Sequence, residues 1–235
     1  MKFEQIRSKR WGRLLLFAFC AVLFLLAVFL IAYRDSIMAG IWFPTSTNSD
    51  EVIYNRQLVS VLKAGCPQGY FGYNESHAVI GTFSTWGPLV IWLYAIPGFF
   101  LGAGYNTMFW CNLLFAVLTW VVLAGRLSKR QQFAFAVVLL CLWIPLRQTF
   151  TATSEPLHFF LLACVVSGSL AAMQGNRKGE VAALVASALD TMIRPYGVIL
   201  FSFRWHAVGK SQRRVAALQQ SHFLRWQQQC FHCGL

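Results

Sequence analysis

Residues 14–33, LLLFAFCAVLFLLAVFLIAY, form a run of 20 almost unbroken apolar residues. As an α-helix, a segment of this length spans about 30 Å, which is the thickness of the hydrocarbon core of a membrane. The run is longer than the apolar part of a signal peptide, and no small-x-small cleavage site ends it. It therefore predicts a retained membrane anchor, with the basic tail 1–13 in the cytoplasm.

The composition extends this interpretation to most of the chain. Of the 235 residues, 57% are hydrophobic and 12% are charged, whereas about a quarter of a soluble domain is charged. We therefore expect an all-α, polytopic membrane protein surrounded by lipid, with about five to six apolar helices in a membrane domain over 14–203. The net charge of +12 comes from the tails and short loops, a distribution typical of membrane topology and not of nucleic-acid binding.

A long segment of mixed polarity, 34–85, follows the anchor and is the expected first outer loop. Within it, 51–64 (EVIYNRQLVSVLKA) predicts an amphipathic helix on the membrane surface. Asp50 and Glu51 stand at its start, where the helix dipole favours ionised acids. The chain has only 8 acidic residues, so this pair is a candidate general base, a ligand set for a divalent cation, or both. The alternative is a solvated turn without a catalytic role.

Basic loops define the expected topology. The N-terminal tail, 126–130 (RLSKR) and 177–178 (RK) are all expected in the cytoplasm. One of the two apolar runs between residues 86 and 125 then does not cross the membrane. The run 86–102 contains two prolines, so we expect it to be re-entrant or packed on the outer side. Two full crossings, with a basic loop outside, are the alternative.

This topology places the remaining ionisable groups at one membrane surface. They are Asp50, Glu51, His77, Arg147, Glu155 and Arg194. Arginines bind phosphate through parallel hydrogen bonds, and a carboxylate deprotonates an acceptor hydroxyl or holds a cation that does so. The alternatives are a snorkelling arginine at a helix end for Arg194 and a simple helix start for Glu155. Asp190, four residues before Arg194, is expected to pair with it on one helix face.

Several stretches resemble GT-C polytopic glycosyltransferases, in particular the dolichyl- and undecaprenyl-phosphate sugar transferases of the protein-mannosyltransferase and aminoarabinose-transferase type. The resemblance covers roughly residues 10–203, and it lies mainly in the order of the motifs. After the anchor and the acidic pair, the motifs are Trp86-Gly87-Pro88, the turn 126–130, Thr153-Ser154-Glu155-Pro156-Leu157 and Met192-Ile193-Arg194-Pro195-Tyr196-Gly197.

The resemblance implies sugar transfer from a polyprenyl-phosphate donor on the periplasmic or luminal face, in a bacterial inner membrane. It implies catalytic roles for Asp50, Glu51 and Glu155, and it places Arg194 near the donor phosphate; Arg147 and His77 are further candidates for substrate binding. The chain departs from the family at residues 86–88, where strong matches have Pro-Pro.

The last residues differ from the rest. Residues 204–235 are basic and rich in Gln, and the short apolar stretch before them cannot span a membrane. We expect a truncated or frame-shifted product, so that the chain is a glycosyltransferase or an inactive fragment of one. The alternative for the tail is a basic amphipathic helix on anionic lipid. The rival hypothesis for the whole chain is a non-enzymatic membrane protein, such as a transporter fragment or an assembly subunit.

Overall fold

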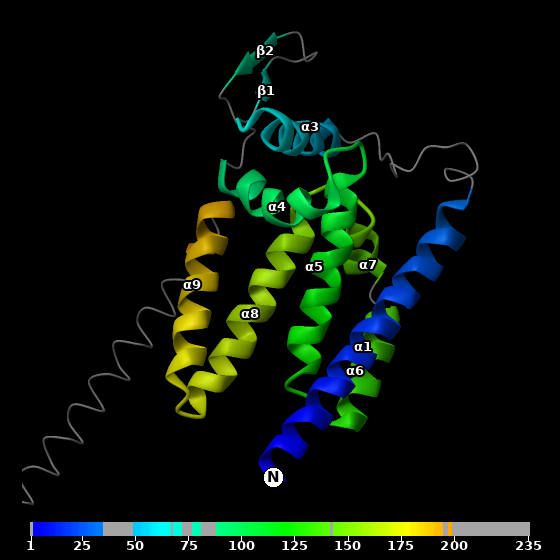
Figure 1. Cartoon of the computed structure of the whole chain (residues 1–235), viewed down its shortest axis with the longest axis vertical. Coiled ribbons are helices and arrows are strands. Elements are labelled where there is room, and N and C mark those ends of the chain that lie inside the picture. The colour runs from blue at the N-terminus through cyan, green and yellow to red at the C-terminus, as the bar shows by residue number, and fades with distance from the viewer. Residues whose placement is uncertain are drawn as a thin grey trace, which may run out of the picture.

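A computed structural model describes residues 2–34, 49–66, 68–71, 77–80, 88–141, 143–194 and 197–198. The described chain is helical apart from one two-stranded hairpin, so the expectation of an α-helical protein is confirmed (Figure 1). The elements are α1 (Lys2–Ala32), α3 (Ser49–Ala64), β1 (Gln68–Phe71), β2 (His77–Ile80), α4 (Pro88–Leu101), α5 (Thr107–Ala124), α6 (Lys129–Cys141), α7 (Trp143–Thr149), α8 (Glu155–Met173) and α9 (Arg177–Ile193).

Three of the described helices are long and apolar enough to cross a membrane. They are Trp11–Ala32 within α1, Thr107–Ala124 and Glu155–Met173. The predicted apolar run 14–33 lies almost entirely within the first of them. The apolar part of α4, Leu89–Leu101, is shorter. By length and composition, α1, α5 and α8 are thus candidates for membrane-spanning helices.

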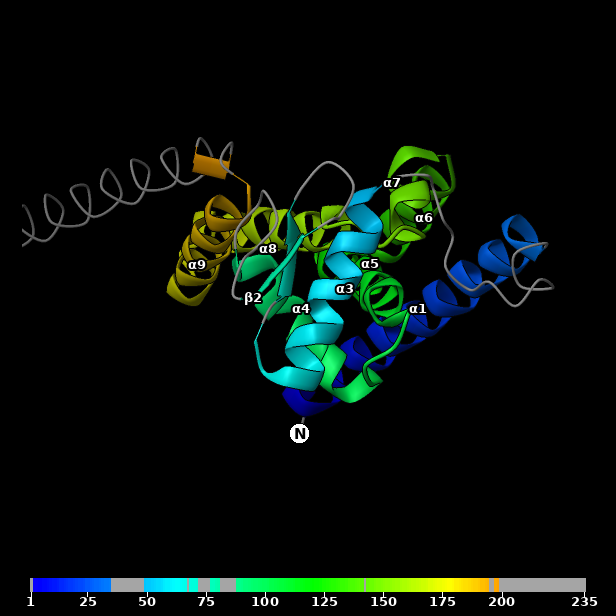
Figure 2. The ribbon, with the colours of Figure 1, turned by 90° about the horizontal axis from the view of Figure 1, so that it is seen from above.

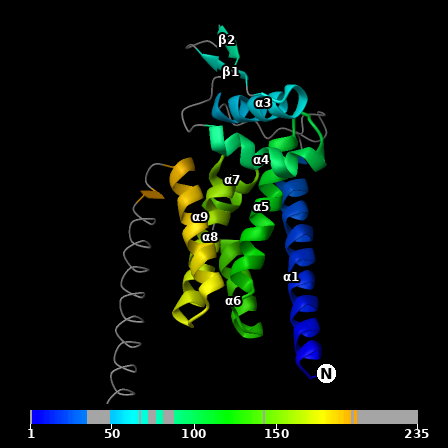
Figure 3. The ribbon, with the colours of Figure 1, turned by 60° about the vertical axis from the view of Figure 1, so that its left-hand side comes forward.

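The helices form a bundle that is covered at one end. α1, α5, α8 and α9 run along the bundle, whereas α3 and α4 lie across its end (Figures 1 and 3). Seen from above, α3 lies over α4 and over the start of α5 (Figure 2). We call this end, where α8 begins and α9 finishes, the cap end. α4 thus lies across the end of the bundle and does not run along it beside α5; whether 86–102 crosses a membrane stays a prediction.

Polar contacts fix the cap to the bundle. The Asn55 amide of α3 accepts a hydrogen bond from the backbone N–H of Met108 (3.1 Å) and donates one to the Gly104 carbonyl (3.3 Å), so α3 caps the first turn of α5. In α4, the Tyr94 hydroxyl donates to the Asn112 side chain at 2.6 Å. Asn112 in turn donates to the Thr153 carbonyl at 3.0 Å. This chain of bonds holds the loop that leads into α8.

Small residues set the spacing of α8 and α9, which pack against each other along their length. A Cβ atom built on Gly168 would lie 2.6 Å from the carbonyl oxygen of Gly179 and 2.9 Å from the Cβ of Ala183. No real Cβ approaches so closely, so the two backbones meet only because both positions are glycine. Close approach through small residues is how helices pack where apolar burial alone does not drive association. The contact fixes the register of the two helices and therefore the position of the polar groups above it.

Candidate functional site

An ion pair at the cap end joins the end of α9 to the start of α8. The Arg194 Nη2 atom donates to Glu155 Oε1 at 2.6 Å and to Ser154 Oγ at 2.9 Å. The Arg194 residue is 8% exposed and Ser154 is buried, whereas the Glu155 side chain is 32% exposed. The structure thus brings together two predicted site residues that are 39 positions apart. Charge-assisted bonds of this kind hold a guanidinium in one orientation.

Tyr54 of α3 packs onto this ion pair from above. Its hydroxyl forms a side-chain hydrogen bond with Ser154, and the residue is 4% exposed. Burial is the main reason that the pKa of Tyr54 is raised to about 12, and the Ser154 bond and the Arg194 charge act in the opposite direction. The charge of Asp50 also acts on this hydroxyl. The charges of three predicted residues, Asp50, Glu155 and Arg194, therefore all act on the Tyr54 hydroxyl.

Glu51 does not share the environment of Asp50. Successive residues of an α-helix point about 100° apart, and here Asp50 is exposed while Glu51 is 1% exposed. Burial raises the pKa of Tyr33, the Arg147 charge lowers it, and the Glu51 charge raises it. Glu51 and Arg147 thus both act on the end of α1. Asp50 and Glu51 thus differ in exposure, and the catalytic role of Glu51 and the substrate-binding role of Arg147 stay predictions.

A divalent cation has no evident site among the described residues. No three His, Cys, Asp or Glu side chains converge on one point there. Asp50 and Glu51, the predicted ligand pair, diverge because they are neighbours on a helix, and one of them is buried. The carboxylates of Asp50 and Glu51 are therefore not arranged to bind one metal ion together.

His77 is placed away from the ion pair. It is the first residue of β2, where it pairs with Phe71 of β1 in an antiparallel hairpin. The hairpin lies on the far side of α3 from α8 and α9 (Figures 1 and 3). Because α3 lies between the hairpin and these two helices, the structure does not bring His77 together with the ion pair, and its role in substrate binding stays a prediction. The sequence places His77 in the same loop as Asp50 but does not show on which side of α3 it lies.

A second polar pair was not predicted from the sequence. His158 Nδ1 lies 2.5 Å from Asp190 Oδ1, and Asp190 is fully buried. The expected pairing of Asp190 with Arg194 is therefore wrong. The reason is local: α9 ends at Ile193, and Arg194 has an extended backbone (φ −130°, ψ 117°) that takes it off the helix face. In the sequence, His158 is marked as a candidate site residue only by its position three residues after Glu155, which puts both side chains on one side of α8.

The chain was compared with protein-family models, with curated proteins and with solved structures, and none of them matches. The resemblance to GT-C glycosyltransferases stays a prediction based on the residues and their order.

Proposed function

We propose that this chain is a multi-pass membrane glycosyltransferase that transfers a sugar from a polyprenyl-phosphate donor to an acceptor hydroxyl on the non-cytoplasmic face of a bacterial inner membrane. The observation that supports this most directly is the ion pair of Arg194 with Glu155 at the cap end, next to Tyr54 of α3, on whose hydroxyl the charge of Asp50 also acts. These residues come from α3, α8 and the end of α9. A donor phosphate and an acceptor hydroxyl require a cation and a base within one site.

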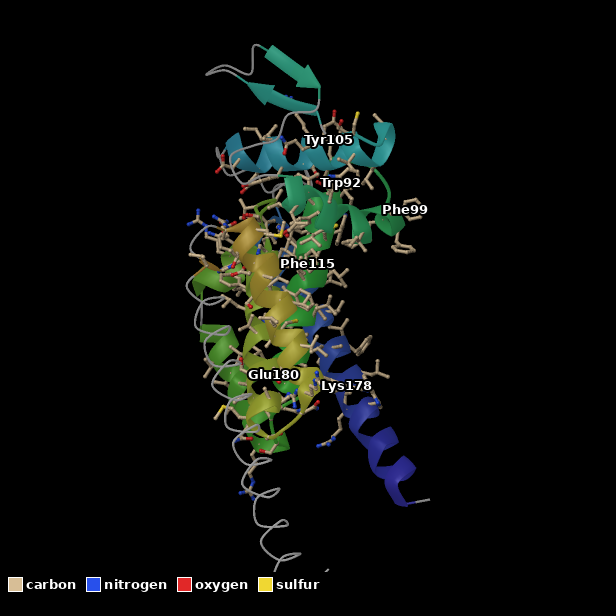
Figure 4. All side chains as sticks on the ribbon, turned by 90° about the vertical axis from the view of Figure 1, so that its left-hand side faces the viewer. Trp92, Phe99, Tyr105, Phe115, Lys178 and Glu180 are labelled. Atoms are coloured by element: carbon tan, nitrogen blue, oxygen red, sulfur yellow. The ribbon has the colours of Figure 1, made fainter. Side chains whose placement is uncertain are left out.

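The charges at the other end of the bundle support the proposed orientation. α1 begins there, and so do the turns that lead into α6 and α9 (Figure 1). Lys178 lies at this end, far from Tyr105 at the cap end (Figure 4). Arg126, Arg177 and Lys178 are all exposed. Basic residues mark the cytoplasmic ends of membrane helices, so the cap end would face the periplasm.

The roles of the residues follow from their exposure and partners. Arg194, held by Ser154 and Glu155, would bind the donor phosphate and stabilise the charge on the leaving group. Asp50 is exposed on the first turn of α3 and would accept the proton of the acceptor hydroxyl. The bond between the sugar and the phosphate oxygen breaks, a bond from the sugar to the acceptor oxygen forms, and polyprenyl phosphate leaves.

The test uses the purified full chain in liposomes with a panel of undecaprenyl-phosphate-linked sugars. Release of undecaprenyl phosphate in the presence of a cell-envelope lipid extract is measured by mass spectrometry. Asp50→Asn is expected to lower the rate by about 10²–10⁴-fold, because a general base contributes that much. Arg194→Gln is expected to abolish donor binding, and Lys178→Gln at the opposite end is the matched control with no effect. Failure to consume any donor would favour a non-enzymatic membrane protein, and full activity of Asp50→Asn would rule out Asp50 as the general base.

A further inference from the structure

A polar groove lies on the cap end, apart from the ion pair. It has a volume of about 630 Å³ and runs between α3 and the loop that joins α4 to α5. The residues that line it are Asn55, Arg56, Val59, Ser60, Lys63, Ala64, Ala103, Gly104 and Tyr105. None of the residues assigned to sugar transfer is among them. The groove therefore requires a separate explanation.

The charge of the groove is positive. Arg56 and Lys63 are both exposed, and they are seven residues apart on α3. Seven residues are two helical turns, so both side chains start from one face of the helix, about 10 Å apart along its axis. Ser60 lies between them, and no lining residue is acidic. A guanidinium and an ammonium at this spacing favour an anion such as a phosphate, which arginine binds through two parallel hydrogen bonds.

The walls of the groove are fixed before any ligand binds. Asn55 ties α3 to the Gly104 carbonyl and to the backbone N–H of Met108. In the loop, the Thr107 hydroxyl accepts from the Gly104 N–H at 2.8 Å and donates to the Gly102 carbonyl at 2.6 Å. Gly102 has a φ of +84°, a conformation that other residues rarely adopt. The loop and α3 are thus held at a constant separation.

Exposed aromatic side chains are found in the groove wall and at the end of α4, the helix that leads into the groove's loop. Tyr105, in its wall, is 89% exposed, and Phe99 and Phe100 at the end of α4 are 77% and 83% exposed. Phe99 and Tyr105 both project from the cap end (Figure 4). Aromatic residues at the end of apolar helices are typical of the membrane interface, where lipid headgroups lie. The apolar span of α5 begins at Thr107, two residues after Tyr105, so the groove opens at the level where that span starts.

We propose that this groove binds the phosphate of an anionic phospholipid headgroup, with Arg56 and Lys63 as its cationic contacts and Tyr105, Phe99 and Phe100 at the adjoining interface. The lipid-binding proposal shares one assumption with the proposed function, namely that α1, α5 and α8 cross the membrane. It does not depend on sugar transfer. Its consequence is that α3, which carries Asp50, is anchored to the lipid surface along its outer face.

The test is native mass spectrometry of the full chain in detergent with added phosphatidylglycerol or phosphatidylcholine. We expect the chain to retain phosphatidylglycerol at least about tenfold more than phosphatidylcholine. The double variant Arg56→Gln/Lys63→Gln is expected to lose this preference. The matched control, Arg177→Gln/Lys178→Gln, removes the same charge at the opposite end and should keep it. Ala64→Phe fills the groove while it leaves both cations in place, and it should also lower retention.

Three results would overturn the proposal. The first is equal retention of the two lipids. The second is an equal loss of phosphatidylglycerol retention in the groove variant and in the opposite-end control. The third is tight binding of free glycerol phosphate, which would show a site for a soluble anion. Asp50→Asn separates this proposal from sugar transfer, because it should lower the transfer rate by about 10²–10⁴-fold and leave phosphatidylglycerol retention unchanged. Absence of transfer activity in the unmodified chain, together with intact phosphatidylglycerol retention, would count against the enzyme and not against the groove.

Discussion

Asp190 of α9 lies 2.5 Å from His158 of α8, measured between Oδ1 and Nδ1, in a pair that joins the two helices near the cap end. Asp190 is fully buried, and the His158 side chain is 13% exposed. The backbone at Gly197 packs against the same carboxylate, because a Cβ there would lie 3.0 Å from Asp190 Oδ2. A buried carboxylate is stable only with a partner that compensates for its lost hydration. His158 supplies that partner here.

Removing one member of this pair should destabilise the protein more than removing both. His158→Leu leaves Asp190 buried without its imidazole, and breaking a buried pair costs about 3–5 kcal/mol. The double variant His158→Leu/Asp190→Leu replaces the pair by apolar side chains and should recover most of the loss. Thermal unfolding in detergent, followed by circular dichroism, measures all four proteins of the cycle. A double variant as unstable as the sum of the single variants would show that the two side chains do not stabilise each other.

This pair illustrates what the sequence could and could not predict. The apolar run 14–33 was predictable because the length of a membrane helix depends only on local sequence. The pairing of Asp190 with His158 depends on the register of α8 against α9, which the contact of Gly168 with Gly179 sets. Such a register is a property of two surfaces and is not visible in either segment alone.

The acidic pair shows the same limit within one element. Asp50 and Glu51 look equivalent in the sequence, but the turn of α3 exposes the first and buries the second. The order of the motifs correctly suggested that Glu155 and Arg194 meet. The order of the motifs could not show that Tyr54 lies near them. An aromatic residue on an amphipathic helix does not indicate which face of that helix packs against the rest of the protein.

The glycine contact between α8 and α9 should be intolerant of larger side chains. In Gly179→Leu, the new side chain would meet Ala171 and the Gly168 carbonyl, so the helices must separate and the Arg194–Glu155 pair must lengthen. We expect a loss of several kcal/mol of stability, of the size seen for severe overpacking. Ala182→Leu introduces the same side chain at an exposed position three residues away and should have little effect. Equal unfolding temperatures for these two variants would contradict the close packing.

The Tyr54 hydroxyl should make stability depend on pH in the alkaline range. Its pKa is raised from 10.0 to about 12 in the folded protein, mainly by burial. The unfolded chain therefore ionises first, and it becomes favoured as pH rises. The stabilisation is fully present below pH 10 and is lost as pH rises to about 12. The shift corresponds to about 2–3 kcal/mol.

Tyr54→Phe provides the control for this measurement, because it cannot ionise and keeps the ring packed. The difference between the unfolding free energies of the two proteins should be constant below pH 10 and should change in favour of the variant above it. Difference absorbance of the folded proteins should show tyrosinate formation by Tyr54 only near pH 12. A titration of this residue near pH 10 would contradict the burial of its hydroxyl.

The orientation of the cap end can be tested with Cys66, which follows α3 and is partly exposed. If the cap end faces the periplasm, a membrane-impermeant maleimide should label Cys66 in intact cells. The experiment uses a chain in which Cys66 is the sole cysteine, together with a cysteine-free chain that carries Arg177→Cys at the opposite end. The second protein should be labelled only after the cells are broken, because Arg177 is exposed at the end where basic residues gather. The reverse pattern would place Asp50, Glu155 and Arg194 in the cytoplasm, where the proposed lipid-linked donor is not presented, and the sugar-transfer proposal would fail.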